Sequence, residues 1–257
     1  MDVIVPTYGR PQQDRQDTVK ALVADGILPI LVVQHREREA YRWYHGPLHI
    51  LPPEITTIAP TRDYLIHNPV WENDHVVFLD DDLHFFARRD DDRTKFRDLR
   101  AGELRRMLAC IDGYLGVVPH VGIAPREGGN RNTQDVLYNT RIMRVLAYRR
   151  SYMRQHGITF APMEVMEDFH VSLQMLKRGA DIVVLNNWCN NQAHGSNAAG
   201  GCSTYRTPEL HARAAETLAR LHAPYVKVVS KETKTAWGGG TRTDVVIQWK
   251  QARNHGT

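Results

Sequence analysis

The sequence is poor in cysteine. It has three cysteines in 257 residues, Cys110, Cys189 and Cys202, and none of them forms a CxxC pair. Disulfide scaffolds need an even number of cysteines at short spacings, and structural zinc sites need paired ones. The sequence therefore indicates neither kind of framework, and we expect three reduced thiols.

Long apolar runs are also missing. No stretch approaches the ~20 apolar residues that span a bilayer. The chain begins with the strand-like Asp2–Val5, where a signal peptide would have a basic and then an apolar region. We therefore expect a cytoplasmic protein with no membrane partner, in the host cytoplasm if the source is viral. No repeat or linker is evident, and nothing indicates an obligate protein partner, so we predict a single domain over residues 1–257.

Acidic residues are absent from one long window and scarce in another. The net charge is +4 and the pI about 9.0. Between Val136 and Met163 there is no acidic residue, whereas five arginines fall there, with tyrosines interleaved: Arg141, Arg144, Arg149, Arg150, Arg154, Tyr138, Tyr148 and Tyr152. The tail from Tyr225 to Arg253 is also basic and contains Trp237 and Trp249. Such windows are equally compatible with solvated faces and with a nucleic-acid surface.

Short apolar runs alternate with helical patterns along the chain. We predict strands at residues 2–5, 30–33, 49–51, 76–79, 121–124 and 182–185, and helices at residues 17–25, 169–178 and 207–221. Residues 136–148 are predicted as a further strand. This alternation predicts an α/β fold, with a mostly parallel sheet flanked by helices.

The most informative stretch is Val76–Leu83, in which four apolar residues lead directly into Asp80, Asp81 and Asp82. The carboxyl end of a buried strand is where an open α/β sheet presents ligand-binding groups. Adjacent carboxylates repel one another unless a cation neutralises them, and oxygen ligands suit Mg²⁺ or Mn²⁺. An acidic turn or a helix cap is the alternative. In an extended segment Asp80 and Asp82 share a face, and Asp81 points to the other.

Three segments in this order resemble nucleotide-sugar-dependent glycosyltransferases of the GT-A fold. They are Val5–Arg10, Ala59–Asp63 and Phe78–Asp82, the last being similar to the DxD metal motif of that family. The resemblance implies a nucleotide-sugar donor, such as a UDP-sugar, bound by residues 1–125 with Mn²⁺ or Mg²⁺. It implies donor contacts from Pro6, Thr7, Tyr8, Arg10, Arg62, Asp63, Asp80 and Asp81, and metal contacts from Asp80 and Asp82. For Arg10 and Arg62, structural ion pairs are an equally good interpretation.

A second acidic motif, Glu167–Asp168, opens the amphipathic helix predicted in the second half of the chain. Taken alone, this pair fits a role in helix capping. In the family that the chain resembles, a similar pair supplies the catalytic base of inverting enzymes. The resemblance thus implies that Asp168 takes the proton of the acceptor hydroxyl, and that Glu167 holds the acceptor or orients the base.

A polar loop follows the last predicted strand and contains His194 and Arg206. The resemblance implies that His194 completes the metal shell, although twelve other histidines make one histidine a weak signal. Arg206, beyond the glycines of this loop, could reach the donor diphosphate. An ordinary loop is the alternative for both residues.

The acceptor half, residues 126–257 with the basic tail, suits a polyanion with bases that can stack. The PTYGRP opening resembles the phage-type, TET-associated glycosyltransferases, which implies a hydroxymethylated pyrimidine of DNA, flipped from the duplex, as acceptor. A glycosyltransferase acting on a glycan or small molecule stays open. So do a nucleotidyltransferase, although Pro6–Arg15 has no lysine and only Gly9, and a non-catalytic DNA-binding module.

Overall fold

The computed structural model describes residues 1–69, 71, 73–128, 131–192, 200–233 and 239–254. Within these ranges, ten strands form one sheet in the order β3-β2-β1-β4-β9-β7-β10-β5-β6, with β8 beside β10. The strands are β1 (Asp2–Pro6), β2 (Ile30–Val33), β3 (Leu48–Ile50), β4 (His75–Leu79), β5 (Leu83–Arg88), β6 (Phe96–Asp98), β7 (His120–Pro125), β8 (Val136–Tyr138), β9 (Val145–Arg149) and β10 (Ile182–Gln192).

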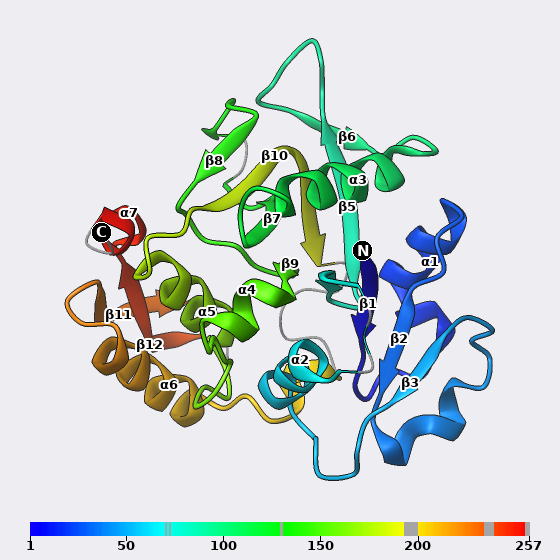
Figure 1. Ribbon diagram of the computed structural model, residues 1–257, viewed down its shortest axis with the longest axis horizontal. Helices are drawn as coiled ribbons and strands as arrows, with labels where there is room; N and C mark the ends of the chain where they lie inside the picture. The colour runs from blue at the N-terminus through cyan, green and yellow to red at the C-terminus, as the bar shows by residue number, and fades with distance from the viewer. Residues whose placement is uncertain (70, 72, 129–130, 193–199, 234–238, 255–257) are drawn as a thin grey trace.

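The sheet is mixed but mostly parallel. Strands β1, β2, β3 and β4 pair in parallel, as do β7 and β10, whereas β5, β8 and β9 run in the opposite direction. Helices cover both faces of the sheet (Figure 1). The predicted α/β architecture is therefore confirmed.

The helices are α1 (Asp17–Ala24), α2 (Ile58–His67), α3 (Glu103–Leu115), α4 (Arg150–Gln155), α5 (Glu167–Leu176), α6 (Pro208–Leu221) and α7 (Trp249–Asn254), with short 3-10 turns at η1 (Gln13–Arg15), η2 (His35–Tyr41) and η4 (Gly201–Thr204). Helices α1 and α3 pack on one face of the sheet, and α2, α4 and α5 on the other, whereas α6 contacts the two strands that follow it. Among the described residues, no helix is both long and apolar enough to cross a membrane.

Strand β4 shows why the sheet forms where it does. It pairs in parallel with β1 and antiparallel with β9, and its residues from Val76 to Leu79 are fully buried. Because side chains alternate along a strand, Val76 and Phe78 enter the core under α2 and α5, while Val77 and Leu79 enter the core under α1 and α3. The acidic triplet thus leaves the sheet at its centre, fixed by neighbours on both sides.

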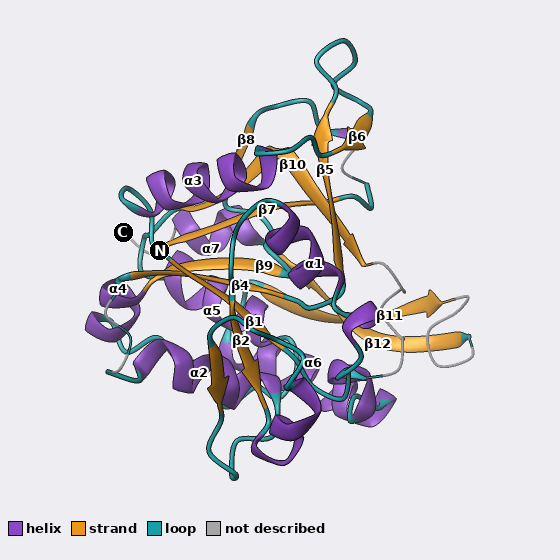
Figure 2. Cartoon of the chain, turned by 90° about the vertical axis from the view of Figure 1, so that its right-hand side faces the viewer, coloured by secondary structure: helices purple, strands orange, loops and turns teal. Residues whose placement is uncertain are grey.

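A separate two-stranded hairpin follows α6. It consists of β11 (Val226–Thr233) and β12 (Gly240–Ile247), and α7 follows it and contacts α5. Figure 1 shows this hairpin next to α6 and α7, and Figure 2 shows it from the side, projecting past the main sheet. The carboxyl-terminal segment therefore packs beside the helix that begins with Glu167 and Asp168.

The prediction of one strand over residues 136–148 is wrong. The structure divides this window into β8 and β9, and Asn139 and Arg144 between them have φ values of 54° and 65°. Left-handed backbone interrupts a strand, and asparagine adopts it more readily than most residues. The β5–β6 hairpin, the β11 strand and α7 were not predicted.

Candidate active site

A cavity of about 550 Å³ opens at the carboxyl ends of β1 and β4. Segments from both halves of the chain contribute to its wall, among them the loop after β1, the acidic triplet after β4, the start of α2, the start of α5, the residues before α6 and the carboxyl-terminal hairpin. Most predicted site residues line it together: Pro6, Thr7, Tyr8, Arg10, Arg62, Asp80, Asp81, Asp82, Glu167, Asp168 and Arg206. Residues far apart in sequence thus form one site, where ligands bind in open α/β sheets.

Asp81 is held by the loop that follows β1. Its carboxylate accepts a hydrogen bond from Thr7 Oγ1 at 2.6 Å and forms an ion pair with Arg10 Nη1 at 2.5 Å. Gln16 supports this loop by donating to Thr7 Oγ1 and to the Arg10 carbonyl, at 2.9 and 2.7 Å. Burial raises the pKa of Asp81 to about 6, although the Arg10 charge and the Thr7 hydrogen bond oppose the rise.

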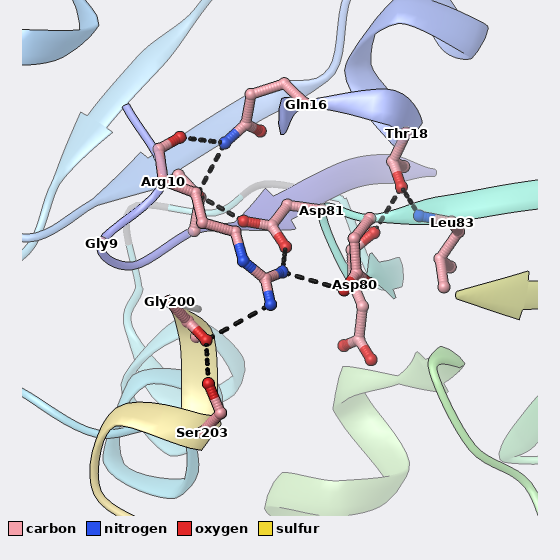
Figure 3. Close-up of polar contacts among 12 residues, drawn as sticks. Gly9, Arg10, Gln16, Thr18, Asp80, Asp81, Leu83, Gly200 and Ser203 are labelled. Carbon is pink, nitrogen blue, oxygen red and sulfur yellow. Dashed lines mark hydrogen bonds and ion pairs between the residues drawn. The ribbon is translucent and has the colours of Figure 1, made fainter. Parts of the chain in front are cut away.

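Arg10 also joins two loops. Its guanidinium lies between Asp81 and the Gly200 carbonyl, to which Nη2 donates at 3.3 Å (Figure 3). Gly200 has φ of +91°, and a Cβ there would lie 2.5 Å from Arg10 Cγ and 2.9 Å from the Gly9 carbonyl oxygen. Only glycine fits this approach, so the segment after residue 199 is fixed against the loop that follows β1.

The side chain of Asp82 is 2% exposed. Its Oδ2 accepts from Arg10 Nη1 at 3.0 Å, and its Oδ1 has no hydrogen-bond partner among the described residues. A buried carboxylate oxygen without a partner is costly, which makes Oδ1 an available ligand atom.

Thr18 of α1 fixes the backbone of the triplet. Its hydroxyl donates to the Asp80 carbonyl at 2.5 Å and accepts from the Leu83 amide at 2.9 Å, and its own amide donates to the Asp81 carbonyl at 3.1 Å (Figure 3). Sequence reasoning missed both Thr18 and Gln16, because a polar residue at a helix start has the same appearance whether it caps the helix or holds a distant loop.

Arg62 of α2 connects the triplet with α5. Its Nη2 lies 3.1 Å from Asp80 Oδ1, and its Nη1 lies 2.5 Å from Glu167 Oε1. Arg62 and Glu167 are buried, whereas the Asp80 side chain is 32% exposed, toward the cavity. Burial raises the pKa of Asp80 to about 6 and that of Glu167 to about 7, and the Arg62 charge opposes both rises.

Asp168 is more exposed than Glu167 and lines the same cavity. It sits in the first turn of α5, where its Oδ1 accepts from the Phe169 amide at 2.9 Å. Met166, the residue before α5, has φ of 62°, so the helix follows a residue in the left-handed conformation. Burial raises the pKa of Asp168, and the charges of Arg141 and Arg62 oppose the rise.

One predicted site residue, Asp63, does not line the cavity. Asp63 points away and accepts from Thr159 Oγ1 at 2.7 Å and from the Phe160 amide at 2.9 Å, so it holds the segment that leads toward α5. His194 falls outside the residues that the structure describes.

The basic window after Val136 divides into structural and cavity-lining arginines. Arg150 is fully buried and pairs with Asp2 at 2.7 Å, and Arg154 donates to the Ile66 carbonyl. Arg141 and Arg144 instead line the cavity. The window therefore does not form one continuous basic face.

The donor set suits a hard divalent cation. Asp80 and Asp82 offer carboxylate oxygens. Mg²⁺ is usually held by one or two carboxylates, and water and substrate phosphates complete its coordination shell. Within the described ranges, no three His, Cys, Asp or Glu residues form a ready-made metal cage. Asp80 and Asp82 thus offer the kind of oxygen ligand that such a cation prefers.

Residues 1–201 match the sequence profile of the TET-associated glycosyltransferase family. The chain therefore belongs to this family, which confirms the resemblance to sugar-transferring enzymes predicted from the sequence. No curated protein matches the chain.

Three solved structures are similar in fold. The first is S. aureus TarS residues 1–349, with a TM-score of 0.48 and 16% identity over 86% of this chain and 65% of that one. The second is GalNAc-T7 with UDP, GalNAc and Mn²⁺, with a TM-score of 0.47 and 10% identity over 86% of this chain and 48% of that one. The third is a putative nucleotide-diphospho-sugar transferase from Desulfovibrio desulfuricans G20, with a TM-score of 0.41 and 12% identity over 86% of this chain and 99% of that one. The chain thus spans about two thirds and about half of the first two.

Proposed function

We propose that this chain transfers a sugar from a nucleotide-sugar donor to the hydroxyl of a hydroxymethylated pyrimidine in DNA. The observation that carries the proposal is the Arg62 bridge, which places the acidic triplet after β4 and the acidic start of α5 in one cavity. One carboxylate group then serves the donor, and the other serves the acceptor.

The donor side is formed by the loop after β1 and by the triplet. Thr7, Tyr8 and Arg10 line the part of the cavity that would hold the nucleoside, and Asp80 and Asp82 would hold a divalent metal with the diphosphate. Bound there, Mn²⁺ or Mg²⁺ would neutralise charge that develops on the leaving diphosphate. Arg206 lines the same cavity and could supply further positive charge to it.

The acceptor side is formed by α5. Asp168 takes the proton from the acceptor hydroxyl. As it does so, the oxygen of that hydroxyl bonds to the anomeric carbon of the sugar, and the bond from this carbon to the diphosphate breaks. Burial raises the pKa of Asp168, which makes it a better proton acceptor than an exposed carboxylate. Glu167, fixed by Arg62, orients the start of the helix.

DNA as the acceptor is supported by the family and by charge. The family's name links it to TET, and the cavity wall carries several arginines, among them Arg141, Arg144 and Arg206. A base inside a duplex cannot reach a cavity of this kind, so the target nucleotide would have to be flipped out.

A donor panel tests the proposal. Purified protein is incubated with UDP-sugars and other nucleotide sugars, with Mn²⁺, and with DNA containing hydroxymethylcytosine or hydroxymethyluracil. Nucleoside mass spectrometry should then detect a glycosylated nucleoside. Sugar found only on an added glycan or small molecule would refute the DNA acceptor while retaining sugar transfer.

A further inference from the structure

One wall of the cavity comes from a part of the chain that lies outside the family match. The match ends at residue 201, yet many side chains beyond it line the cavity, among them Arg206, His211, Lys231, Arg242, Asp244 and Trp249. The family match therefore does not explain what the residues of this wall do.

The wall is a packed part of the fold. Val226 and Val245 of the hairpin, Leu218 of α6 and Ala252 of α7 are buried in the same apolar core as Phe169 of α5. Burying these side chains fixes the hairpin against the helix that carries Asp168. Its cavity-facing residues are consequently held at a defined position relative to the proposed base.

The wall has an excess of positive charge. Asp244, 8% exposed, accepts from Lys231 Nζ at 3.1 Å and from Arg242 Nη2 at 2.9 Å, so one carboxylate positions two cations. Arg206 adds a third cation on the same wall. The same cavity is also lined by Asp80, Asp81 and Asp82, which carry the opposite charge.

The aromatic part of the wall lies on the acceptor side. Trp249 contacts Phe169, the residue after Asp168, with ring centroids 5.7 Å apart and planes at 79°. On the same Phe169 ring, the Arg141 guanidinium lies 4.6 Å from the centroid. Any molecule whose hydroxyl reaches Asp168 must come close to this group of flat side chains.

We infer that the wall formed by Lys231, Arg242 and Trp249 is a binding subsite for the acceptor nucleotide, with the two cations contacting phosphates and Trp249 contacting the flipped base. This inference rests on the proposed function. Aromatic side chains that stack on bases, together with cations that contact the backbone, are the usual means of holding unpaired nucleotides. The subsite recognises phosphate, so the donor diphosphate is the competing ligand that an experiment must separate from DNA.

The experiment compares Lys231→Ala and Trp249→Ala with Lys227→Ala in the full chain. Lys227 lies on the same strand but does not line the described cavity, so it matches the charge change. Two properties are measured: nucleotide-sugar affinity without DNA, and KM for DNA containing hydroxymethylcytosine or hydroxymethyluracil as a function of salt.

We expect Trp249→Ala to raise KM for DNA about tenfold or more. We expect Lys231→Ala to raise it as well and to reduce the slope of log affinity against log salt by about 0.7–0.9, the value for one lost phosphate contact. The affinity for the nucleotide sugar should stay at the wild-type value in all three variants. Lys227→Ala should also keep the wild-type KM for DNA. Circular dichroism of each variant separates these effects from misfolding.

Three outcomes would overturn the inference: weaker donor binding with an unchanged KM for DNA, equal losses in Lys231→Ala and Lys227→Ala, or no loss in any variant. Failure of the proposed function gives a different result, since the wild type itself would then transfer no sugar to DNA.

Discussion

The guanidinium of Arg62 lies 2.5 Å from the carboxylate of Glu167, which is 105 residues away in sequence. The same guanidinium also reaches Asp80, so a single buried cation fixes the end of β4 relative to the start of α5. The groups proposed to serve the donor and the acceptor are therefore held at a set separation.

Replacing Arg62 by alanine should destabilise the protein strongly. The change leaves Glu167 and Asp80 without their cation, and breaking one side of a buried ion pair typically costs about 3–5 kcal/mol. Urea unfolding followed by circular dichroism measures the loss. Arg89→Ala, which breaks the exposed Arg89–Asp91 pair, is the control and should stay close to the wild type.

The double variant Arg62→Met, Glu167→Gln distinguishes an ion pair from a simple packing role. Removing both charges should recover part of the stability lost in Arg62→Ala, because Glu167 is then no longer buried as an unpaired anion. A double variant as unstable as Arg62→Ala would contradict this explanation.

Asp82→Asn should remove the effect of metal on donor binding. The change replaces a carboxylate oxygen, which has no partner among the described residues, by an amide that binds hard cations poorly. Calorimetric titration of UDP should show affinity that rises with Mn²⁺ in the wild type and stays constant in the variant. Asp91→Asn, at an exposed carboxylate, provides the control, and a normal Mn²⁺ response in Asp82→Asn would count against the metal assignment.

Asp168→Asn should lower kcat by about 100- to 10,000-fold, the usual contribution of a general base. UDP affinity should stay unchanged, because Asp168 lies on the acceptor side. A rapid assay of UDP release with DNA present measures kcat. Equal losses of kcat and UDP affinity would indicate a structural role for Asp168 instead.

Activity should fall as the pH drops below neutral. Burial raises the pKa of Glu167 to about 7 and also raises that of Asp168, so this acidic pair takes up a proton where exposed carboxylates remain ionised. A base must be deprotonated, so kcat should fall as the pH drops from 8 to 6. A flat profile over this range would mean that the pair does not titrate in the rate-limiting step.

Stability should change in the opposite direction over the same range. Since the pKa of Glu167 is higher in the folded state than in the unfolded chain, the folded state holds more protons between about pH 4 and pH 7. The contribution of Glu167 to stability is therefore full below that range and is lost as the pH rises through about 7. Comparing unfolding midpoints of wild type and Glu167→Gln against pH isolates this contribution.

Thr18→Val should weaken donor binding without direct contact to the donor. The variant keeps the shape of the side chain but leaves the buried Leu83 amide without its acceptor, at a cost of about 1–3 kcal/mol. Thr18→Ser retains the hydroxyl and should restore UDP affinity. If Val and Ser behave alike, the hydroxyl does not position the triplet.

Local patterns accounted for much of the fold and for many of the cavity residues. The apolar run of β4 and the carboxylates after it could be recognised because strand periodicity and charge are properties of neighbouring residues. The Arg62–Glu167 pair, the support from Thr18 and the structural role of Asp63 depend on contacts between distant segments. Strand β5 was missed although Leu83, Phe85 and Ala87 alternate with less buried neighbours over part of its length, because charged residues soon follow them.

The most direct measurement is nucleoside mass spectrometry on two DNA duplexes, one with hydroxymethylcytosine and the other with cytosine at the same positions. Each duplex is treated with the wild type or with Asp168→Asn, in the presence of Mn²⁺ and the nucleotide sugar that the donor panel selects. Sugar should be found on hydroxymethylcytosine with the wild type, be nearly absent with Asp168→Asn, and never occur on cytosine. Equal sugar transfer by Asp168→Asn, or none to either duplex by the wild type while a glycan is modified, would contradict the account of this cavity.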